Sequence, residues 1–128
     1  EQVAARADVG LRTVFRHFQD MDSLYREMSG AIEGALRAII DQPFRASGWR
    51  AQLMELVERR TRAFETIAPY RRAGDALRGR SAFLKADSAR LTLALRQILI
   101  SVLPFDVAER RDMVEPLDLL LSFETWSR

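Results

Sequence analysis

VAARADVGLRTVFRHFQDMDSLY, residues Val3 to Tyr25, has the pattern of two short helices joined by a tight turn and followed by the start of a longer helix. The small residues Ala4 and Ala5 lie on the first helix and leave room for another helix to cross closely. Asp8 and Gly10 suit the turn, because aspartate and glycine tolerate left-handed backbone conformations. This stretch therefore predicts a helix-turn-helix.

The second short helix, from about Leu11 to Phe18, has one apolar and one polar face. Val14 and Phe18 lie four residues apart and face the interior, and the opposite face offers donors to phosphates and base edges in a major groove. Arg12 and Arg16 suit base edges, because arginine pairs bidentately with guanine, whereas the threonine and the histidine suit phosphates. The predicted DNA-binding residues are Arg12, Thr13, Phe15, Arg16 and His17.

The same stretch resembles the DNA-binding signature of the TetR family of bacterial repressors. The residues that carry the resemblance are Thr13, Phe15, His17, Phe18, Leu24 and Tyr25. The chain departs from the family pattern at Asp8, Gly10 and Met21, where the family usually has a glycine, a serine and often a lysine. The resemblance covers residues 1–25. It implies a ligand-responsive DNA-binding repressor that is a homodimer, with an all-α fold in which an N-terminal helix-turn-helix head is followed by a C-terminal ligand-binding and dimerisation bundle.

Apolar spacing and prolines divide the rest of the chain into helices. The predicted ranges are Asp22–Ile40, Gly48–Ile67, Tyr70–Gly79, Ala82–Leu103 and Val107–Ser127. In the second of these, the spacing places Arg60 on the apolar side and Arg59 on the solvent side. We expect residues 1–41 to be the DNA-binding domain with its connecting helix, whose first helix would precede Glu1. Residues 42–128 would be the ligand-binding and dimerisation domain, continuing beyond Arg128.

Composition excludes several classes of protein. The chain has 128 residues, 48% of them hydrophobic, a net charge of +2 and no cysteine, which excludes disulfides and thiolate metal sites. No apolar run approaches the roughly 20 residues that span a bilayer, so we expect a cytoplasmic protein. His17 is the only histidine, and carboxylate pairs such as Glu55 and Glu58 suit a solvated helix face. We therefore expect neither an enzyme nor a metal or other cofactor.

Polar residues within the apolar helical stripes suggest a small-molecule cavity. We expect it between the helices Gly48–Ile67, Ala82–Leu103 and Val107–Ser127. The predicted ligand-binding residues are Thr61, Tyr70, Gln97, Ser101, Ser122 and Trp126. A surplus of arginines favours an apolar or amphipathic acid as the effector; these are Arg59, Arg60, Arg62, Arg71 and Arg72. The alternative is a solid bundle in which such polar groups are satisfied locally.

The last predicted helix is too broadly apolar for one packing partner, which indicates a homodimer. The predicted interface residues are Leu117, Leu120 and Leu121. Two alternatives to the TetR-type regulator remain open. One is a helix-turn-helix protein of another class, a recombinase or an activator. The other is an all-helical protein-interaction module that does not bind DNA.

Overall fold

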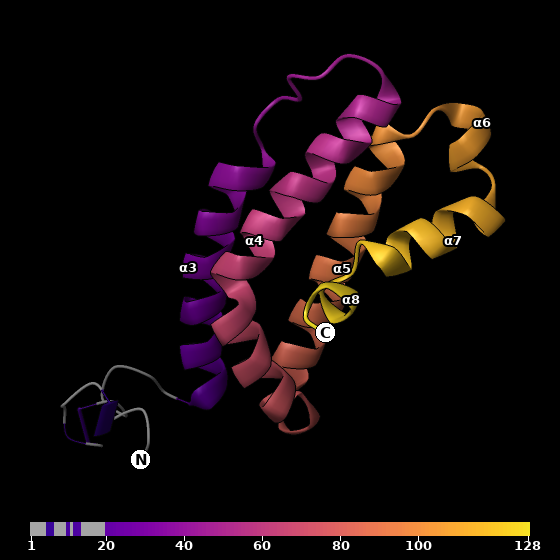
Figure 1. The fold of residues 1–128 in the computed structure, drawn as a ribbon. Helices are drawn as coiled ribbons and strands as arrows, with labels where there is room; N and C mark the ends of the chain where they lie inside the picture. The colour runs from indigo at the N-terminus through magenta and orange to yellow at the C-terminus, as the bar shows by residue number, and fades with distance from the viewer. Residues whose placement is uncertain (1–4, 7–9, 11, 14–19) are drawn as a thin grey trace.

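The computed structural model describes residues 5–6, 10, 12–13 and 20–128. These residues are helical and contain no strand, which confirms the all-α prediction. The elements are α3 (Met21–Ile40), α4 (Trp49–Leu77), η1 (Arg78–Arg80), α5 (Ala82–Val102), α6 (Phe105–Ala108), α7 (Arg111–Leu120) and α8 (Phe123–Trp126). The long helices α3, α4 and α5 lie side by side in an antiparallel array, and the short helices lie beside α4 and α5 (Figure 1).

Helix α3 begins and ends where the sequence predicts. Asp20 is its N-cap, and the carboxylate accepts a hydrogen bond from the backbone N–H of Ser23 at 2.7 Å. This contact satisfies one of the amides that a helix start leaves without an intrahelical partner. At the other end the N–H of Asp41 bonds to the carbonyl of Arg37. The predicted helix from Asp22 to Ile40 is therefore correct to within one residue at its start.

The connection between α3 and α4 is held by a buried arginine. The Arg59 side chain donates to the carbonyls of Ile40, Gln42 and Pro43, with the Pro43 contact at 2.6 Å. Arg59 is 4% exposed, so the prediction that it faces solvent is wrong. Its guanidinium also lies over the ring of Phe44, 4.4 Å from the centroid. These contacts explain why a charged side chain is buried: loop carbonyls replace the water it loses.

Helix α4 continues through Pro69 to Leu77, so the predicted break before Tyr70 is wrong. Proline lacks the N–H that would bond to the carbonyl of Glu65. Both Glu65 and Pro69 are exposed, so water can hydrate that carbonyl and the helix can continue. The axis of α4 changes direction partway along its length (Figure 1). The proline therefore redirects the helix instead of ending it.

The predicted single helix over 107–127 is also wrong, because α6, α7 and α8 take its place. At the α7–α8 junction, Arg60 donates to the carbonyl of Leu121 at 2.9 Å. In a continuous helix that carbonyl would accept from Thr125, whose N–H instead bonds to the hydroxyl of Ser122 at 3.2 Å. Two side chains thus take up the backbone groups that would continue the helix.

The buried apolar residues form two clusters. The first joins α3, α4 and α8 and comprises Leu36, Ala63, Phe64, Ile67, Ala68 and Phe123. The second joins α4, α5 and α7 and comprises Leu56, Leu99, Val102, Leu103 and Val114. Arg60, which is 3% exposed, also donates to the carbonyl of Leu95 and so links α4 to α5. The C-terminal helices are therefore part of the core.

Candidate ligand-binding site

A cavity of about 720 Å³ lies between the three long helices. Its lining comes from 21–41 at α3, from 67–78 in the second half of α4 and the start of η1, and from 84–98 in α5, and Arg6 also lines it. Ligand sites in proteins commonly measure about 300–1,000 Å³. The cavity is therefore large enough for a small organic molecule.

The walls of the cavity are mainly apolar. On α3 the lining residues recur every fourth position, which places them on one face of the helix; they are Leu24, Met28, Ile32, Leu36 and Ile40. On α5 the apolar lining is Leu84, Leu91, Leu95 and Ile98, and on α4 it includes Ile67, Ala73 and Leu77. At a rise of about 1.5 Å per residue, the α3 wall extends for roughly 24 Å. The cavity is accordingly long as well as apolar.

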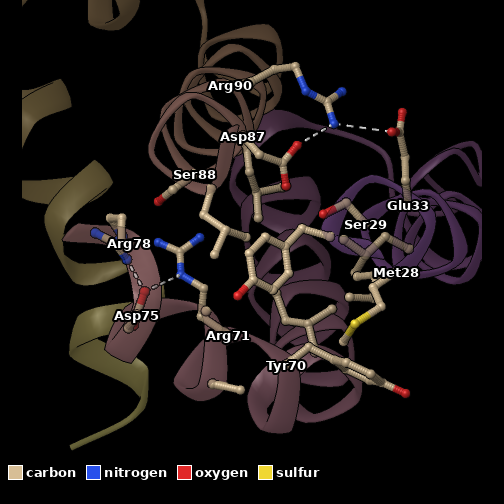
Figure 2. A pocket seen from close by; sticks show the side chains of 18 of the residues that line it. Met28, Ser29, Glu33, Tyr70, Arg71, Asp75, Arg78, Asp87, Ser88 and Arg90 are labelled. Carbon is tan, nitrogen blue, oxygen red and sulfur yellow. Dashed lines mark hydrogen bonds and ion pairs between the residues drawn. The ribbon is translucent and has the colours of Figure 1, made fainter. Parts of the chain in front are cut away.

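Exposed apolar side chains mark its rim. Met21, Met28 and Tyr70 line the cavity and are 44%, 39% and 49% exposed, respectively. Figure 2 shows Met28 and Tyr70 on the same side of the cavity. Methionine is flexible and polarizable and adapts to apolar groups of different shape. The rim is thus suited to admitting an apolar molecule.

An ion-pair group joins α3 to α5 at the cavity. Arg90 of α5 lies 3.1 Å from a carboxylate oxygen of Glu33 on α3 and 2.9 Å from one of Asp87 (Figure 2). Hydrogen bonds from Arg90 and then Arg37 lower the pKa of Glu33, and the bond to Asp87 raises that of Arg90. Glu33 therefore favours its charged form here and is unsuited to proton transfer.

Arg71 is the most enclosed charged group that lines the cavity. Its side chain is 11% exposed, and one terminal nitrogen donates to Glu124 of α8 at 3.0 Å. The Nε atom is buried, lies 3.6 Å from Asp75 and has no hydrogen-bond partner among the described residues. Asp75 also pairs with Arg78 (Figure 2). Arg71 therefore retains donor capacity next to an apolar cavity.

Four hydroxyl groups add polar character to the lining. They belong to Tyr25, Ser29, Tyr70 and Ser88. None of them makes a side-chain hydrogen bond within the part of the chain that the structure describes; Figure 2 shows Ser29, Tyr70 and Ser88 around the cavity. A bound molecule with a hydrogen-bonding group can use them.

Only Tyr70 of the six predicted ligand-binding residues lines this cavity. Thr61 and Ser101 donate to backbone carbonyls of their own helices, at 3.1 and 2.8 Å. Gln97 is exposed on α5. Ser122 and Trp126 lie at α8. Ser122 caps this helix, and the ring centroid of Trp126 lies 5.8 Å from that of Phe64.

The predicted position of the cavity was wrong for a physical reason. The space between α4, α5 and α7 is filled by the second buried cluster. A second cavity close to it measures about 10 Å³, which is room for one water molecule. The space that remains open lies between α3, α4 and α5, on the other side of α5. The sequence contained one signal for it, the four-residue apolar repeat of α3.

Two of the predicted DNA-binding residues fall in the described part of the chain. Arg12 is exposed, and Thr13 is partly exposed. The N–H of Thr13 bonds to the carbonyl of Gly10 at 2.8 Å, which fits glycine at a helix N-cap. Phe15, Arg16 and His17 lie outside the described residues.

The predicted dimer-interface residues differ in exposure. Leu117 and Leu121 are half-buried and pack against the second cluster of the same chain. Leu120 is 65% exposed, and its neighbour Leu119 is 66% exposed. The exposed apolar surface of α7 is therefore formed mainly by Leu119 and Leu120, with Met113 at 37% exposure.

Comparison of the chain with protein-family models, with curated proteins and with solved structures gave no match. None of the described helices is long and apolar enough to cross a membrane. The described residues also contain no group of three or more His, Cys, Asp or Glu side chains placed to bind a metal ion. Within the described residues, the cavity is therefore the structural basis for a functional proposal.

Proposed function

We propose that this protein is a DNA-binding transcription regulator of the TetR type, acting as a repressor whose affinity for its operator depends on a small molecule. The stretch Val3 to Tyr25 supplies the DNA-binding part of the proposal through its resemblance to that family. The cavity between α3, α4 and α5 supplies the ligand-binding part. The protein would be a cytoplasmic homodimer that presents two recognition helices to double-stranded DNA.

One observation carries the proposal: α3 belongs to both parts. It begins at Met21, shortly after the stretch of sequence that is predicted to be the recognition helix, and it lines the cavity along its length. A ligand in the cavity therefore contacts the helix that leads into the DNA-binding stretch. Such a ligand alters DNA affinity only through different affinities for two states, typically worth about 1–3 kcal/mol.

Contacts at the start of α3 can couple a ligand-induced movement of this helix to the DNA-binding stretch. The hydroxyl of Ser81, the N-cap of α5, donates to the carboxylate of Asp22 at 2.8 Å. Ser81 is 7% exposed, so this bond is shielded from water. The guanidinium of Arg26 lies 5.5 Å from the ring centroid of Phe83. A ligand that moves α3 relative to α5 would change these contacts next to the DNA-binding stretch.

The proposal is tested by selecting duplexes from a random pool with the full-length protein and measuring their affinity over a range of salt concentrations. Phosphate contacts release counterions, so the affinity for DNA should fall steeply as salt rises. A protein-interaction module would select no duplex and show no such dependence. Selection of no duplex would contradict the proposal.

Substitutions at the recognition helix sharpen this test. Arg12→Ala should cost roughly 1–3 kcal/mol and relax the preference at one base pair, whereas Thr13→Ala should weaken all duplexes alike. Arg62 is an exposed arginine on α4, and Arg62→Ala should leave DNA binding unchanged. Equal effects of Arg12→Ala and Arg62→Ala would remove Arg12 from the DNA contact.

A further inference from the structure

The shape and chemistry of the cavity restrict its ligand. The α3 wall presents an apolar face from Leu24 to Ile40, and apolar residues of α5 oppose it. Burial of apolar surface is favourable in proportion to its area, so a molecule that follows this wall gains most if it is elongated. A compact, highly polar molecule would leave the wall in contact with water. The cavity therefore favours a long apolar ligand.

The charges around the cavity are not equivalent. Arg90 is 61% exposed and already engages two carboxylates. Arg37 is 68% exposed and pairs with Glu33. Arg71 also lies near two carboxylates, 3.0 Å from Glu124 and 3.6 Å from Asp75, but its side chain is only 11% exposed, and its Nε lacks a hydrogen-bond partner among the described residues. Because Arg71 is the guanidinium of the lining that is least exposed to water, its charge-assisted hydrogen bonds to an anion would be the strongest here.

We propose that the cavity binds an elongated amphipathic carboxylate, with its carboxylate at Arg71 and its apolar chain along α3. In Figure 2 Arg71 lies across the view from Met28 and Tyr70, so the chain would extend from the enclosed guanidinium toward the rim. The effect of such a ligand on DNA affinity rests on the proposed function. The binding itself depends only on the cavity.

Glu124 competes with such a ligand. Its carboxylate is 59% exposed and lies 3.0 Å from Arg71, where it takes one of the donors that an incoming carboxylate needs. Because the glutamate is well hydrated, its ion pair with Arg71 contributes little, and a ligand carboxylate held in an apolar cavity can displace it. Removing the charge of Glu124 should therefore strengthen carboxylate binding. A neutral ligand should not respond to that change.

The test uses decanoate and decanol as matched probes, with dissociation constants measured by calorimetry on the full-length protein below micelle-forming concentrations. The wild-type protein should bind decanoate more tightly than decanol. Arg71→Gln should weaken decanoate binding about tenfold or more and leave decanol binding unchanged, since only the carboxylate makes charge-assisted hydrogen bonds. Glu124→Gln should tighten decanoate binding and leave decanol binding unchanged.

Arg72→Gln is the matched control, because Arg72 is the next residue of α4 and is exposed and absent from the cavity lining. It should bind both probes as the wild-type protein does. If Arg71→Gln does not fold, the Glu124→Gln variant still tests whether the ligand carboxylate binds at Arg71. An unchanged preference for decanoate in Arg71→Gln, an unchanged affinity in Glu124→Gln, or binding of neither probe by the wild-type protein would overturn the inference.

The proposal of DNA binding and the proposal of carboxylate binding at Arg71 can be contradicted independently of each other. Duplex selection by the ligand-free protein reports on DNA binding without any reference to the cavity. Selected duplexes together with decanoate binding that ignores Arg71 would overturn the ligand assignment alone. Arg71-dependent binding of decanoate by a protein that selects no duplex would overturn the DNA-binding function and leave the ligand assignment standing.

Discussion

Two neighbouring arginines, Arg59 and Arg60, show at the residue scale how this chain buries charge. Each is less than 5% exposed, and each donates mainly to backbone carbonyls. Burial lowers the pKa of Arg60, and the charge of Asp118 partly opposes that effect. The helical spacing placed Arg60 correctly on the apolar side of α4. It misplaced Arg59, because the carbonyls that receive Arg59 belong to a loop that helix periodicity does not describe.

Replacement of Arg60 by methionine should destabilise the protein by about 2 kcal/mol. The substitution keeps much of the side-chain volume but removes the donor to the carbonyls of Leu95 and Leu121, and the Leu121 carbonyl has no helical N–H to replace it. Urea denaturation of the variant and the wild-type protein measures the difference. Arg62→Met, on the exposed side of the same helix, should change stability by no more than about 0.5 kcal/mol. Equal stabilities of Arg60→Met and the wild-type protein would contradict this role.

Glu55 makes a pH-dependent contribution to the loop between α3 and α4. It accepts backbone hydrogen bonds from Arg45 and Ala46, both at 3.0 Å, and it pairs with Arg59 at 2.6 Å. The bond from Ala46, followed by that from Arg59, lowers its pKa below the ordinary 4.5. Because the folded-state pKa is the lower one, the stabilisation is present above pH 4.5 and is lost as the pH falls through the folded-state value.

The Glu55→Gln variant should therefore melt at a lower temperature than the wild-type protein at neutral pH. The difference should shrink as the pH falls below 4.5, where the wild-type glutamate becomes protonated. Thermal melts of both proteins across that range provide the measurement. A melting-temperature difference that does not vary with pH would show that the charge of Glu55 contributes nothing.

At the scale of elements, α3 and α5 were predicted to within one residue from apolar spacing and prolines, because their ends depend on local sequence. Asp20 caps α3 and Ser81 caps α5, each accepting from an N–H in the first turn. The C-terminal helices were not predictable, because Arg60 sets the end of α7 from a position far away in sequence. Pro69 was misread for a related reason. Whether a proline ends a helix depends on the solvation of the carbonyl it leaves free, which is a tertiary property.

Replacement of Pro69 by alanine should stabilise α4 and alter the cavity. Alanine restores an N–H toward the Glu65 carbonyl and has a higher helix propensity, so the gain can reach about 3 kcal/mol. Only the half of α4 from Ile67 onward lines the cavity, so straightening the helix should also weaken binding of cavity ligands. Thermal denaturation and calorimetry with decanoate measure the two effects.

The control for this substitution is Pro43→Ala, in the loop before α4. No helical hydrogen bond is regained there, so no comparable gain in stability should follow. A Pro69→Ala protein with the stability and ligand affinity of the wild-type protein would show that the proline has no part in shaping the cavity.

At the scale of the whole molecule, the described chain divides into a packed side and an open side. The side formed by α4, α5 and α7 is filled by the second buried cluster, and the side formed by α3, α4 and α5 holds the cavity. The sequence predicted helices and an apolar core, but it could not show which helices leave space between them. Tyr70 was predicted as a ligand residue, whereas Arg71 was noted only for its charge, because its enclosure depends on α8.

The exposed apolar surface of α7 leads to a prediction about assembly. The neighbouring residues Leu119 and Leu120 are 66% and 65% exposed, and burying them against a second copy would remove this area from water. The full-length protein should sediment as a dimer at micromolar concentration, and Leu120→Glu should shift it toward the monomer. Leu93→Glu, at a similarly exposed position on α5, should remain a dimer. A monomeric wild-type protein would contradict the proposed homodimer.

In the proposed regulator, a cavity ligand and operator DNA influence each other through α3. The most direct test measures the affinity of the full-length protein for a selected duplex, with and without a saturating compound that calorimetry shows to bind. Gly74 lines the cavity, and a Cβ atom at this position would meet no atom within 4 Å, so the side chain of Gly74→Leu should project into the cavity and obstruct ligand binding, whereas that of Gly34→Leu on exposed α3 surface should not. Saturating ligand should change the duplex affinity roughly 5- to 150-fold, and this change should be absent in Gly74→Leu and retained in Gly34→Leu. The same duplex affinity with and without saturating ligand would contradict it.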